Sequence, residues 1–316
     1  MEKFASVIGG INIDIKGTAF SEINESGSYP GEVFISPGGV ARNVSENLAR
    51  LGIDVKLFGC VGDDHFGNLI LNETASAGVD TDYIIKAKGM KTSAYLSAAG
   101  SNKDFFYAVN DMQNSMELIT PLYLKQIQEV LGKSSLIVLD TNPDAEFLNE
   151  AVRFANEKNI PVFIDTVSDK KALKVSDISG KIDYLSPNNS EFVKLFGDYR
   201  GTGELEKKLN EGKFDNFSYI LLKKDKEGAD VICSAEKIIY HTDALNTAIK
   251  EVSGAGDAFN AGFIFSIIES GPGNADVVKA AWTGSCAASF ALKSFRSVSE
   301  DLTKESLTEL YNIKFK

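Results

Sequence analysis

The chain has 316 residues, of which 43% are hydrophobic and 24% are charged, a composition typical of an ordinary globular protein. This length suits one large α/β domain, or one domain with a small appendage. Acidic residues outnumber basic ones by 44 to 33, and the net charge of −11 excludes a basic surface for a nucleic acid. A small anionic ligand must therefore be held by local donors against an unfavourable overall field.

The sequence also indicates the compartment. The amino terminus has no long apolar region, so we expect no signal peptide, and runs such as 258–268 are too short to span a bilayer. Cys60, Cys233 and Cys286 are few, odd in number and far apart, which favours buried thiols in a reducing compartment over disulfides or a metal site. We expect a cytoplasmic protein that binds neither membranes nor nucleic acids.

The first segment, Ser6–Asp14, begins as a buried strand and ends in polar groups. Ligands gather at the carboxyl ends of strands in open α/β sheets, so Asn12 and Asp14 are candidates to contact one. The alternative is an Asx turn that closes the strand. Residues 15–36 are polar, contain glycine and do not continue a βα pattern, so we expect them to leave the core.

Pro37 and two glycines then open a helix. Its apolar face is formed by Val40, Val44, Leu48 and Leu51. Gly38 and Gly39 allow the backbone to approach a ligand closely, and Arg42 and Asn43 lie in the first turn. This arrangement suits a polyhydroxylated ligand, although it is also compatible with a helix start bearing solvated polar residues.

Two β-rich runs at 92–99 and 104–109 predict a hairpin with a turn at 100–103. Together with residues 15–36, they predict a small sheet outside the main core. Asn110 and Asp111 end the hairpin and could point polar groups back towards a site, or could form an ordinary turn.

From residue 121 onward the chain alternates between helices and strands. Helices at 121–131 and 145–155 alternate with buried strands at 136–140 and 161–165, which predicts right-handed crossovers and a parallel sheet. The charged run at 223–227 is interpreted as a solvated loop.

Asn188 and Glu191 lie three residues apart at the start of a predicted helix. Their amide and carboxylate could hold a hydrated Mg²⁺ through water. The alternative is a capping box, in which both groups only close the helix terminus.

Gly254, Ala255 and Gly256 precede Asp257 and an apolar run that predicts a buried helix at 258–268. The free amides and positive dipole of a helix N-terminus form an anion site. A carboxylate repels a phosphate, so its presence beside an anion site calls for an explanation. One explanation is that the carboxylate accepts a proton from an alcohol that attacks the phosphorus. We expect the helix N-terminus to lower the pKa of Asp257. The alternative is a glycine-rich turn with Asp257 as N-cap.

These motifs resemble those of the ribokinase/PfkB carbohydrate kinase family, and the resemblance covers nearly the whole chain. The matching residues, in chain order, are Asn12 and Asp14, Gly38-Gly39 with Asn43, Asn188 with Glu191, and Gly254-Ala255-Gly256-Asp257. Each motif is weak alone, but the four in this order on a βα chain are specific.

The resemblance implies a ribokinase-like three-layer α/β sandwich with a mostly parallel central sheet and a small β-sheet lid. The kinase core would comprise residues 1–14, 37–91 and 111–316, and the lid residues 15–36 and 92–110. The lid would exclude water and so limit ATP hydrolysis. Members of the family often pair through such lids, so we expect a homodimer.

The resemblance also implies a reaction in which ATP phosphorylates the 5′-hydroxyl of a sugar or nucleoside. Asp257 would be the catalytic base, with the γ-phosphate held by Gly254, Ala255 and Gly256. The implied substrate-binding residues are Asn12, Asp14, Gly38, Gly39, Arg42, Asn43, Tyr95, Asn110 and Asp111. The implied ATP-binding residues are Asn188, Lys223, Asp225, Gly228, Gly254 and Gly256, with Mg²⁺ at Glu191 and Asn188.

Within the family, the segments around Arg42, Tyr95 and Asn110 are most similar to the pseudouridine kinases. Ribokinases and fructokinases usually carry a small residue in place of Arg42. Pseudouridine is therefore the expected substrate, with ribose, fructose or another nucleoside as alternatives.

The chain departs from the family pattern at two places. Glu251-Val252 replaces the usual Asp-Thr, which bears on the family's site for a monovalent cation such as K⁺. Lys223-Lys224-Asp225 replaces Ser/Thr-x-Gly, so lysines stand near the expected phosphates but the hydroxyl is missing.

Two other classes of protein are alternatives to a kinase. A nucleoside-binding protein without turnover would not need Asp257. A Rossmann oxidoreductase requires Gly-x-Gly-x-x-Gly after the first strand, and the segment Gly9–Asn12 does not supply it.

Overall fold

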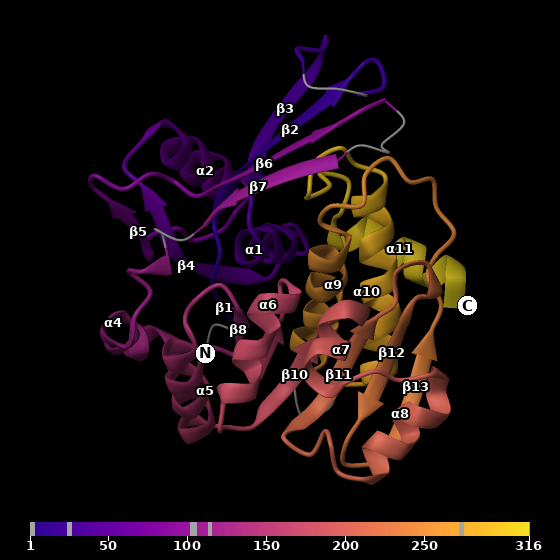
Figure 1. The fold of residues 1–316 in the computed structure, drawn as a ribbon. Coiled ribbons are helices and arrows are strands. Elements are labelled where there is room, and N and C mark those ends of the chain that lie inside the picture. The colour runs from indigo at the N-terminus through magenta and orange to yellow at the C-terminus, as the bar shows by residue number, and fades with distance from the viewer. Residues whose placement is uncertain (1–3, 24–26, 102–105, 113–115, 272–274, 316) are drawn as a thin grey trace.

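The computed structural model describes residues 4–23, 27–101, 106–112, 116–271 and 275–315. Two sheets organise the chain: nine strands in the order β13-β12-β11-β10-β9-β8-β1-β4-β5, and four in the order β3-β2-β6-β7. Figure 1 shows the four-stranded sheet projecting from one end of the molecule, above helices α1 and α9. The expected combination of a large core sheet and a small separate sheet is confirmed.

The large sheet is parallel except at one edge. Its strands are β1 (Phe4–Ile8), β4 (Asp54–Gly62), β5 (Ile84–Ala87), β8 (Leu136–Asp140), β9 (Val162–Asp165), β10 (Ile182–Ser186), β11 (Phe217–Lys223), β12 (Ala229–Cys233) and β13 (Ile238–Thr242). At that edge β12 pairs in antiparallel fashion with both β11 and β13, and β12 and β13 form a hairpin. The predicted βα alternation therefore builds a mostly parallel sheet.

The alternation of side chains along the strands divides the core into two layers. In β8, Leu136 and Val138 belong to one hydrophobic cluster, while Ile137 and Leu139 belong to the other. The first cluster is covered by α1 (Val40–Arg50), α2 (His65–Ser76), α9 (Ala255–Ser270), α10 (Val277–Leu292) and α11 (Lys304–Phe315). The second is covered by α4 (Pro121–Leu131), α5 (Ala145–Lys158), α7 (Asn189–Phe196) and α8 (Gly201–Asn210). Helices on both faces of the sheet complete the expected three layers.

Several short elements had no counterpart in the sequence expectations. They are β5, α8, α6 (Asp169–Ala172), and the 3-10 turns η1 (Leu173–Asp177) and η2 (Asp225–Glu227). The sequence of α8, GTGELEKKLN, is mostly polar, and only Leu205 and Leu209 are buried. A helix with so few apolar positions gives a weak periodic signal.

The first predicted strand is in fact two strands. β1 ends at Ile8 and β2 (Asn12–Ala19) belongs to the small sheet, so the expectation of one strand through Asp14 was wrong. The chain turns around the carboxylate of Asp140: the Gly10 amide donates to Asp140 Oδ2 at 2.7 Å, and a methyl group at Gly9 would lie 2.2 Å from Asp140 Cγ. Two glycines are needed here because the Asp140 carboxylate fills the side-chain space of Gly9 and the Asn142 amide fills that of Gly10.

The small sheet is completed by β3 (Gly31–Gly38), β6 (Ala94–Ala99) and β7 (Phe106–Asp111). β6 and β7 are antiparallel, which confirms the predicted hairpin, although residues 102–105 of its turn and second strand lie outside the described residues. β2 lies between β3 and β6, antiparallel to the first and parallel to the second.

Two further features bear on the expectations about compartment. The three cysteines are all free and buried, as expected. Across the described ranges, no helix combines the length and apolar character needed to cross a bilayer.

We expect opposite effects from two Gly→Ala substitutions in helices. At Gly262 in α9, an added methyl would lie 2.7 Å from Ala287 Cβ of α10, whereas at Gly203 in α8 nothing lies within 4 Å. Gly262→Ala should lower the free energy of unfolding by about 1–3 kcal/mol through overpacking. Gly203→Ala should raise it by about 0.5 kcal/mol because alanine favours the helix. Urea midpoints that shift in the same direction for both variants would contradict this packing.

Candidate active site

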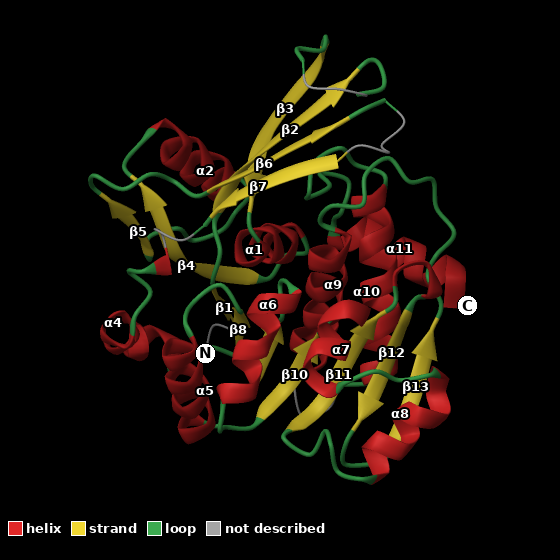
Figure 2. Cartoon of the chain, viewed as in Figure 1, coloured by secondary structure: helices red, strands yellow, loops and turns green. Residues whose placement is uncertain are grey.

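Several of the predicted site residues, among them Asn43, Gly254 and Asp257, lie where α1 and α9 begin, beneath the small sheet. Helices α1 and α9 lie against each other, and Figure 2 shows the small sheet above them. The carboxyl ends of β8, β9 and β11 reach the same region, because their terminal residues Asp140, Asp165 and Lys223 interact with one another or with Asp257. Parallel strands place their carboxyl ends along one edge, and this edge carries the site.

Asp257 and Asn43 form the link between the two helices. Asn43 Nδ2 donates a hydrogen bond to Asp257 Oδ2 at 2.8 Å, although the residues are 214 positions apart. The N-cap of α9 is Gly254 and not Asp257, so the alternative in which Asp257 caps the helix was wrong. Asp257 lies in the first turn, with its carboxylate held by the first turn of α1.

The first turn of α9 also presents backbone amides. Gly254 has φ 83°, and a methyl there would lie 1.9 Å from the Ser297 carbonyl oxygen, so only glycine fits. The Ala255 amide donates to the Val252 carbonyl at 3.3 Å. The amides of Gly256 and Asp257 have no acceptor among the described residues. These two amides are therefore available to an anion, whereas the Ala255 amide is already occupied.

Burial raises the pKa of Asp257 to about 7, and the negative charge of Asp165 acts in the same direction. The hydrogen bond from Asn43 and the positive charge of Lys223 oppose this shift. The expectation that the helix N-terminus lowers the pKa was therefore wrong, because desolvation and a second carboxylate outweigh the dipole. A carboxylate with a pKa near 7 is a stronger base than an ordinary aspartate.

Lys223 lies beside this turn within a buried polar cluster. Its Nζ donates to Asp165 Oδ2 at 3.0 Å, and Asn260 Nδ2 donates to the same oxygen at 2.7 Å. A methyl at Gly256 would lie 3.7 Å from Lys223 Nζ. Burial alone would lower the pKa of Lys223, but Asp165 and Glu191 raise it overall, so the ammonium stays charged beside the first turn of α9.

The interpretation of 223–227 as a solvated loop was wrong for its first two residues. Lys223 is held by Asp165, and Lys224 forms an ion pair of 3.1 Å with Asp230, whereas residues 225–227 are exposed. Gly228 has φ 88°, and a methyl there would lie 1.9 Å from the Thr242 carbonyl oxygen, so the glycine closes this turn.

Asp140 and Asp165 are functional candidates that the sequence reasoning missed. Asp140 Oδ2 accepts from the amides of Gly10 at 2.7 Å and Ala41 at 3.1 Å, which fixes the start of α1 against β1. Burial raises the pKa of Asp140. The available signal was an aspartate as the last residue of each of two consecutive buried strands.

Asp14 lies on β2 in a second polar group. Asn12 Nδ2 donates to Asp14 Oδ1 at 2.6 Å, and Ser297 Oγ donates to Asp14 Oδ2 at 3.3 Å. A methyl at Gly38 would lie 2.4 Å from Asp14 Cγ, and one at Gly39 would lie 2.3 Å from the Gly10 carbonyl oxygen. Gly38 thus allows close packing against the Asp14 carboxylate, and Gly39 allows close packing against the backbone of Gly10. Burial raises the pKa of Asp14.

The strand register decides which lid residues share a face with Asp14. Asp14 pairs with Tyr95, and Tyr95 pairs with Asn110, so these three side chains lie on one face together with Asn12. Asp111 pairs with Ala94 and lies on the opposite face. The structure brings Asn110 to this face and leaves Asp111 away from it.

Arg42 is 4% exposed, and its guanidinium is occupied by protein groups. It donates to the Pro37 carbonyl at 3.1 Å and to Asn43 Oδ1 at 2.9 Å, and it forms an ion pair with Glu46. Burial lowers its pKa to about 10. These contacts orient Asn43, whose amide in turn holds Asp257.

Asn188 and Glu191 form a capping box at the start of α7, which confirms the alternative given for this pair. Glu191 Oε2 accepts from the Asn188 amide at 2.8 Å and from Thr166 Oγ1 at 2.5 Å. No group of three His, Cys, Asp or Glu side chains suited to a metal occurs within the part of the chain that the structure describes. These residues therefore fit Mg²⁺ only as outer ligands to an ion that keeps its water or phosphate oxygens.

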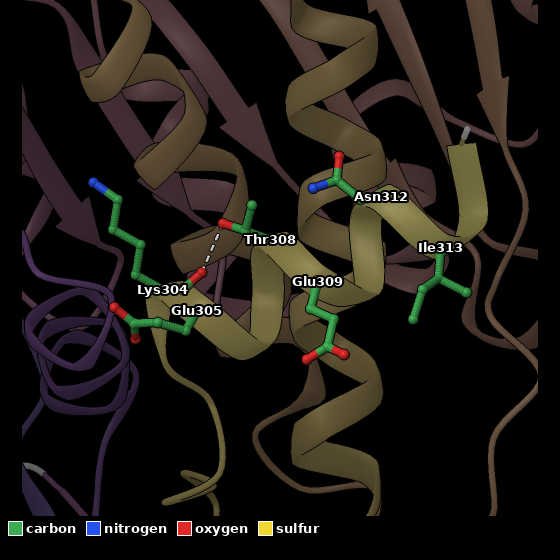
Figure 3. Close-up of a pocket in the computed structure, with 6 residues that line it drawn as sticks. All are labelled: Lys304, Glu305, Thr308, Glu309, Asn312 and Ile313. Atoms are coloured by element: carbon green, nitrogen blue, oxygen red, sulfur yellow. Dashed lines mark hydrogen bonds between the residues drawn. The ribbon is translucent and has the colours of Figure 1, made fainter.

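Two surface hollows differ in their relation to the site. One of about 530 Å³ is lined by Asn188 and Asp225, two of the predicted ATP-binding residues, together with residues of α6 and α7. The other lies along α11 and is lined by residues of that helix alone (Figure 3). Only the first involves residues implied in nucleotide binding.

Comparison with known proteins identifies the family. The sequence profile of the pfkB family carbohydrate kinases matches residues 2–302. The chain belongs to this family. As a pfkB family kinase, it is a phosphotransferase that acts on a hydroxyl group.

Individual relatives of this pfkB kinase differ in substrate. It is 32% identical to the pseudouridine kinase of Escherichia coli over 279 residues, which covers 85% of each chain. It is 33% identical to the uncharacterized sugar kinase YeiI of the same organism over 276 residues, covering 85% of this chain and 73% of the relative. The structure of Arabidopsis thaliana ribokinase complexed with ribose and ATP matches with a TM-score of 0.81 at 19% identity over 100% of both chains, which confirms the ribokinase-like fold.

We expect kcat/KM of this kinase to fall as the pH drops through about 7, because protonated Asp257 cannot accept a proton. Asn43→Ala removes a donor that lowers this pKa, so the acidic limb should move to higher pH. Initial rates across a pH series measure the limb, and Asn47→Ala in the same helix is the control. An acidic limb near 3.8, the ordinary value for aspartate, would contradict the assignment.

Proposed function

We propose that the protein is an ATP-dependent kinase that phosphorylates the 5′-hydroxyl of pseudouridine to give pseudouridine 5′-phosphate. The observation that carries the proposal is the Asn43–Asp257 hydrogen bond beside the two open amides of the first turn of α9. This arrangement combines a base for an alcohol with donors for a phosphoryl group, and phosphoryl transfer needs both.

The choice of pseudouridine rests on residues and on one relative. Arg42 and the segments around Tyr95 and Asn110 resemble pseudouridine kinases, and the pseudouridine kinase of E. coli is 32% identical. The sugar kinase YeiI is similar to the same degree, so ribose and fructose remain the competing substrates. A nucleoside-binding role without turnover would leave Asp257 without a purpose.

In the proposed reaction each residue has a defined task. Asn12 and Asp14 bind hydroxyl groups of the sugar, and Asn43 orients Asp257 towards the 5′-hydroxyl. As the hydroxyl oxygen attacks the γ-phosphorus of ATP, Asp257 accepts its proton and ADP leaves. The amides of Gly256 and Asp257, with the Lys223 ammonium nearby, stabilise the charge on the transferred group.

ATP binding would use Asn188 and Asp225, which line the hollow at the start of α7, together with Gly228. Mg²⁺, when bound to the nucleotide, neutralises phosphate charge, and Glu191 and Asn188 would reach it through water. For K⁺, Glu251 Oε1 already accepts from the Val252 amide at 2.8 Å and the Ser253 amide at 3.2 Å. Only its second carboxylate oxygen and nearby carbonyls would then serve a monovalent cation.

The lid would comprise residues 15–36 and 92–110, closing over a core of 1–14, 37–91 and 111–316. We also infer a cytoplasmic location from the three free thiols, which are typical of a reducing compartment.

A homodimer through the lid is part of the proposal. The lid face opposite Asp14 is apolar and exposed, and its most exposed members are Val33, Ile35, Leu96, Tyr107 and Val109. The strand pairing Ile35–Ile15–Leu96–Val109 places a continuous apolar row on this face. Exposed apolar patches of this kind are typical of surfaces that associate.

The substrate is tested by ATP-dependent phosphorylation of pseudouridine, uridine, adenosine, ribose and fructose. We expect the highest kcat/KM for pseudouridine and loss of turnover in Asp257→Asn, since the amide can still accept from Asn43 but cannot take a proton. A higher kcat/KM for ribose or fructose would support the kinase reaction but refute pseudouridine as the substrate. Tight nucleoside binding without turnover in the wild-type protein would reject the kinase.

The dimer is tested by light scattering after size-exclusion chromatography. We expect Leu96→Asp with Val109→Asp to convert a dimer into monomers, because two carboxylates would be buried at the apolar interface. Leu122→Asp, at a side chain 67% exposed on α4, is the matched control and should leave the mass unchanged. A wild-type monomer would exclude the lid interface.

A further inference from the structure

Lys16 presents a buried ammonium on the substrate face of the lid. The Nζ atom is buried and has no hydrogen-bond partner among the described residues. Lysine almost never buries its ammonium without a partner, because the lost hydration is costly. The side chain therefore calls for an acceptor that the protein itself does not provide.

The position of Lys16 relates this ammonium to the proposed site. Along β2 it is two residues beyond Asp14, on the same face, and it pairs with Ser97 of β6 and Phe34 of β3. Two residues of a strand span about 6.6 Å, so Lys16 lies one side-chain row further from the start of α1 than Asp14. A ligand whose sugar is held by Asp14 would extend towards Lys16 with its remaining part.

The charges around Lys16 restrict the kind of acceptor. Burial raises the pKa of Asp14, and the Lys16 charge is among the effects that oppose it. Burial also acts to raise the pKa of Glu251, but hydrogen bonds from Ser253 and the Lys16 charge lower it overall. Two carboxylates thus lie near the one Lys16 ammonium. Their negative charge disfavours an anionic ligand, whereas a neutral carbonyl oxygen can still accept a hydrogen bond from the ammonium.

We propose that Lys16 binds a carbonyl oxygen of the nucleobase and so makes this site selective for nucleosides with carbonyl-bearing bases over plain sugars. The proposal rests on the proposed kinase function and deepens it, because it assigns the base-binding end of the site to β2. The uracil ring of pseudouridine carries two such oxygens, whereas ribose and fructose offer no group that would reach this row.

The test compares Lys16→Met, Lys16→Gln and Lys16→Arg with the wild-type kinase on pseudouridine and on ribose. Loss of a hydrogen bond from a charged donor should raise KM for pseudouridine by about 10–100-fold in Lys16→Met, with kcat little changed. Lys16→Arg should restore most of the affinity, and kcat/KM for ribose should stay the same in all variants. Lys133→Met, at a side chain 65% exposed, is the matched control.

A second measurement does not depend on turnover. Because the ammonium has no acceptor in the unliganded protein, Lys16→Met should raise Tm. Pseudouridine should then stabilise Lys16→Met less than wild type in a thermal shift series. A large drop in Tm in both Lys16→Met and Lys16→Gln would instead show a structural role and overturn the proposal.

The outcomes separate the two levels of the argument. Suppose the wild-type protein phosphorylates pseudouridine, but Lys16→Met lowers kcat/KM equally for pseudouridine and ribose, or lowers it for neither. Base recognition by Lys16 is then refuted, and the kinase function stands. If the wild-type protein uses only plain sugars, or prefers a sugar acid, both the proposed substrate and the role of Lys16 are refuted.

Discussion

The arrangement of the site depends on a cluster of carboxylates at the carboxyl ends of the strands of the large sheet. Asp140 and Asp165 close two adjacent parallel strands, and Asp257 opens α9 beside them. Two buried carboxylates and a third that is half-buried would be unstable this close together if all were charged and unpaired. Lys223 and Asn260 bind Asp165, while the amides of Gly10 and Ala41 bind Asp140. Among the described residues, the Asp257 carboxylate accepts one side-chain hydrogen bond, from Asn43, and its raised pKa suits the base role proposed for it.

The two faces of the small sheet differ in character, because successive side chains of a strand point to opposite faces. One face carries Asn12, Asp14, Lys16, Tyr95 and Asn110, which are polar groups suited to a ligand. The other face carries an exposed apolar row. A shift of one residue in any strand pairing would exchange these faces, so the register of β2 with β3 and β6 is a functional constraint as well as a structural one.

The glycines of the site are explained by what surrounds them. Gly38 lies against the Asp14 carboxylate, Gly39 against the Gly10 carbonyl, and Gly254 against the Ser297 carbonyl. In each case a side chain would occupy space that a polar group already fills. These glycines serve the packing of the site, and in the proposed function the ligand contacts fall to side chains such as Asp14 and to amides such as that of Gly256.

The sequence by itself determined the class of the fold and the main motifs. Apolar runs of strand length alternating with helical periods require a mostly parallel sheet, and a polar interruption with its own hairpin requires a separate small sheet. The Gly254–Asp257 motif, followed by a fully apolar helix, also pointed to the residue proposed as the base, because few other arrangements place a carboxylate after three small residues. These features are local, and local patterns can be read from spacing alone.

Only the tertiary structure decided how the distant residues act on one another. The pKa of Asp257 depends on Asp165 and on burial, neither of which is encoded near position 257, so the local helix dipole predicted the wrong direction. Arg42 turns towards Asn43 and Glu46, and Asp111 lies on the opposite face from Asn110, because packing and strand register orient their side chains. The unpartnered Lys16 could be recognised only after folding, since burial without an acceptor is a property of the whole surroundings.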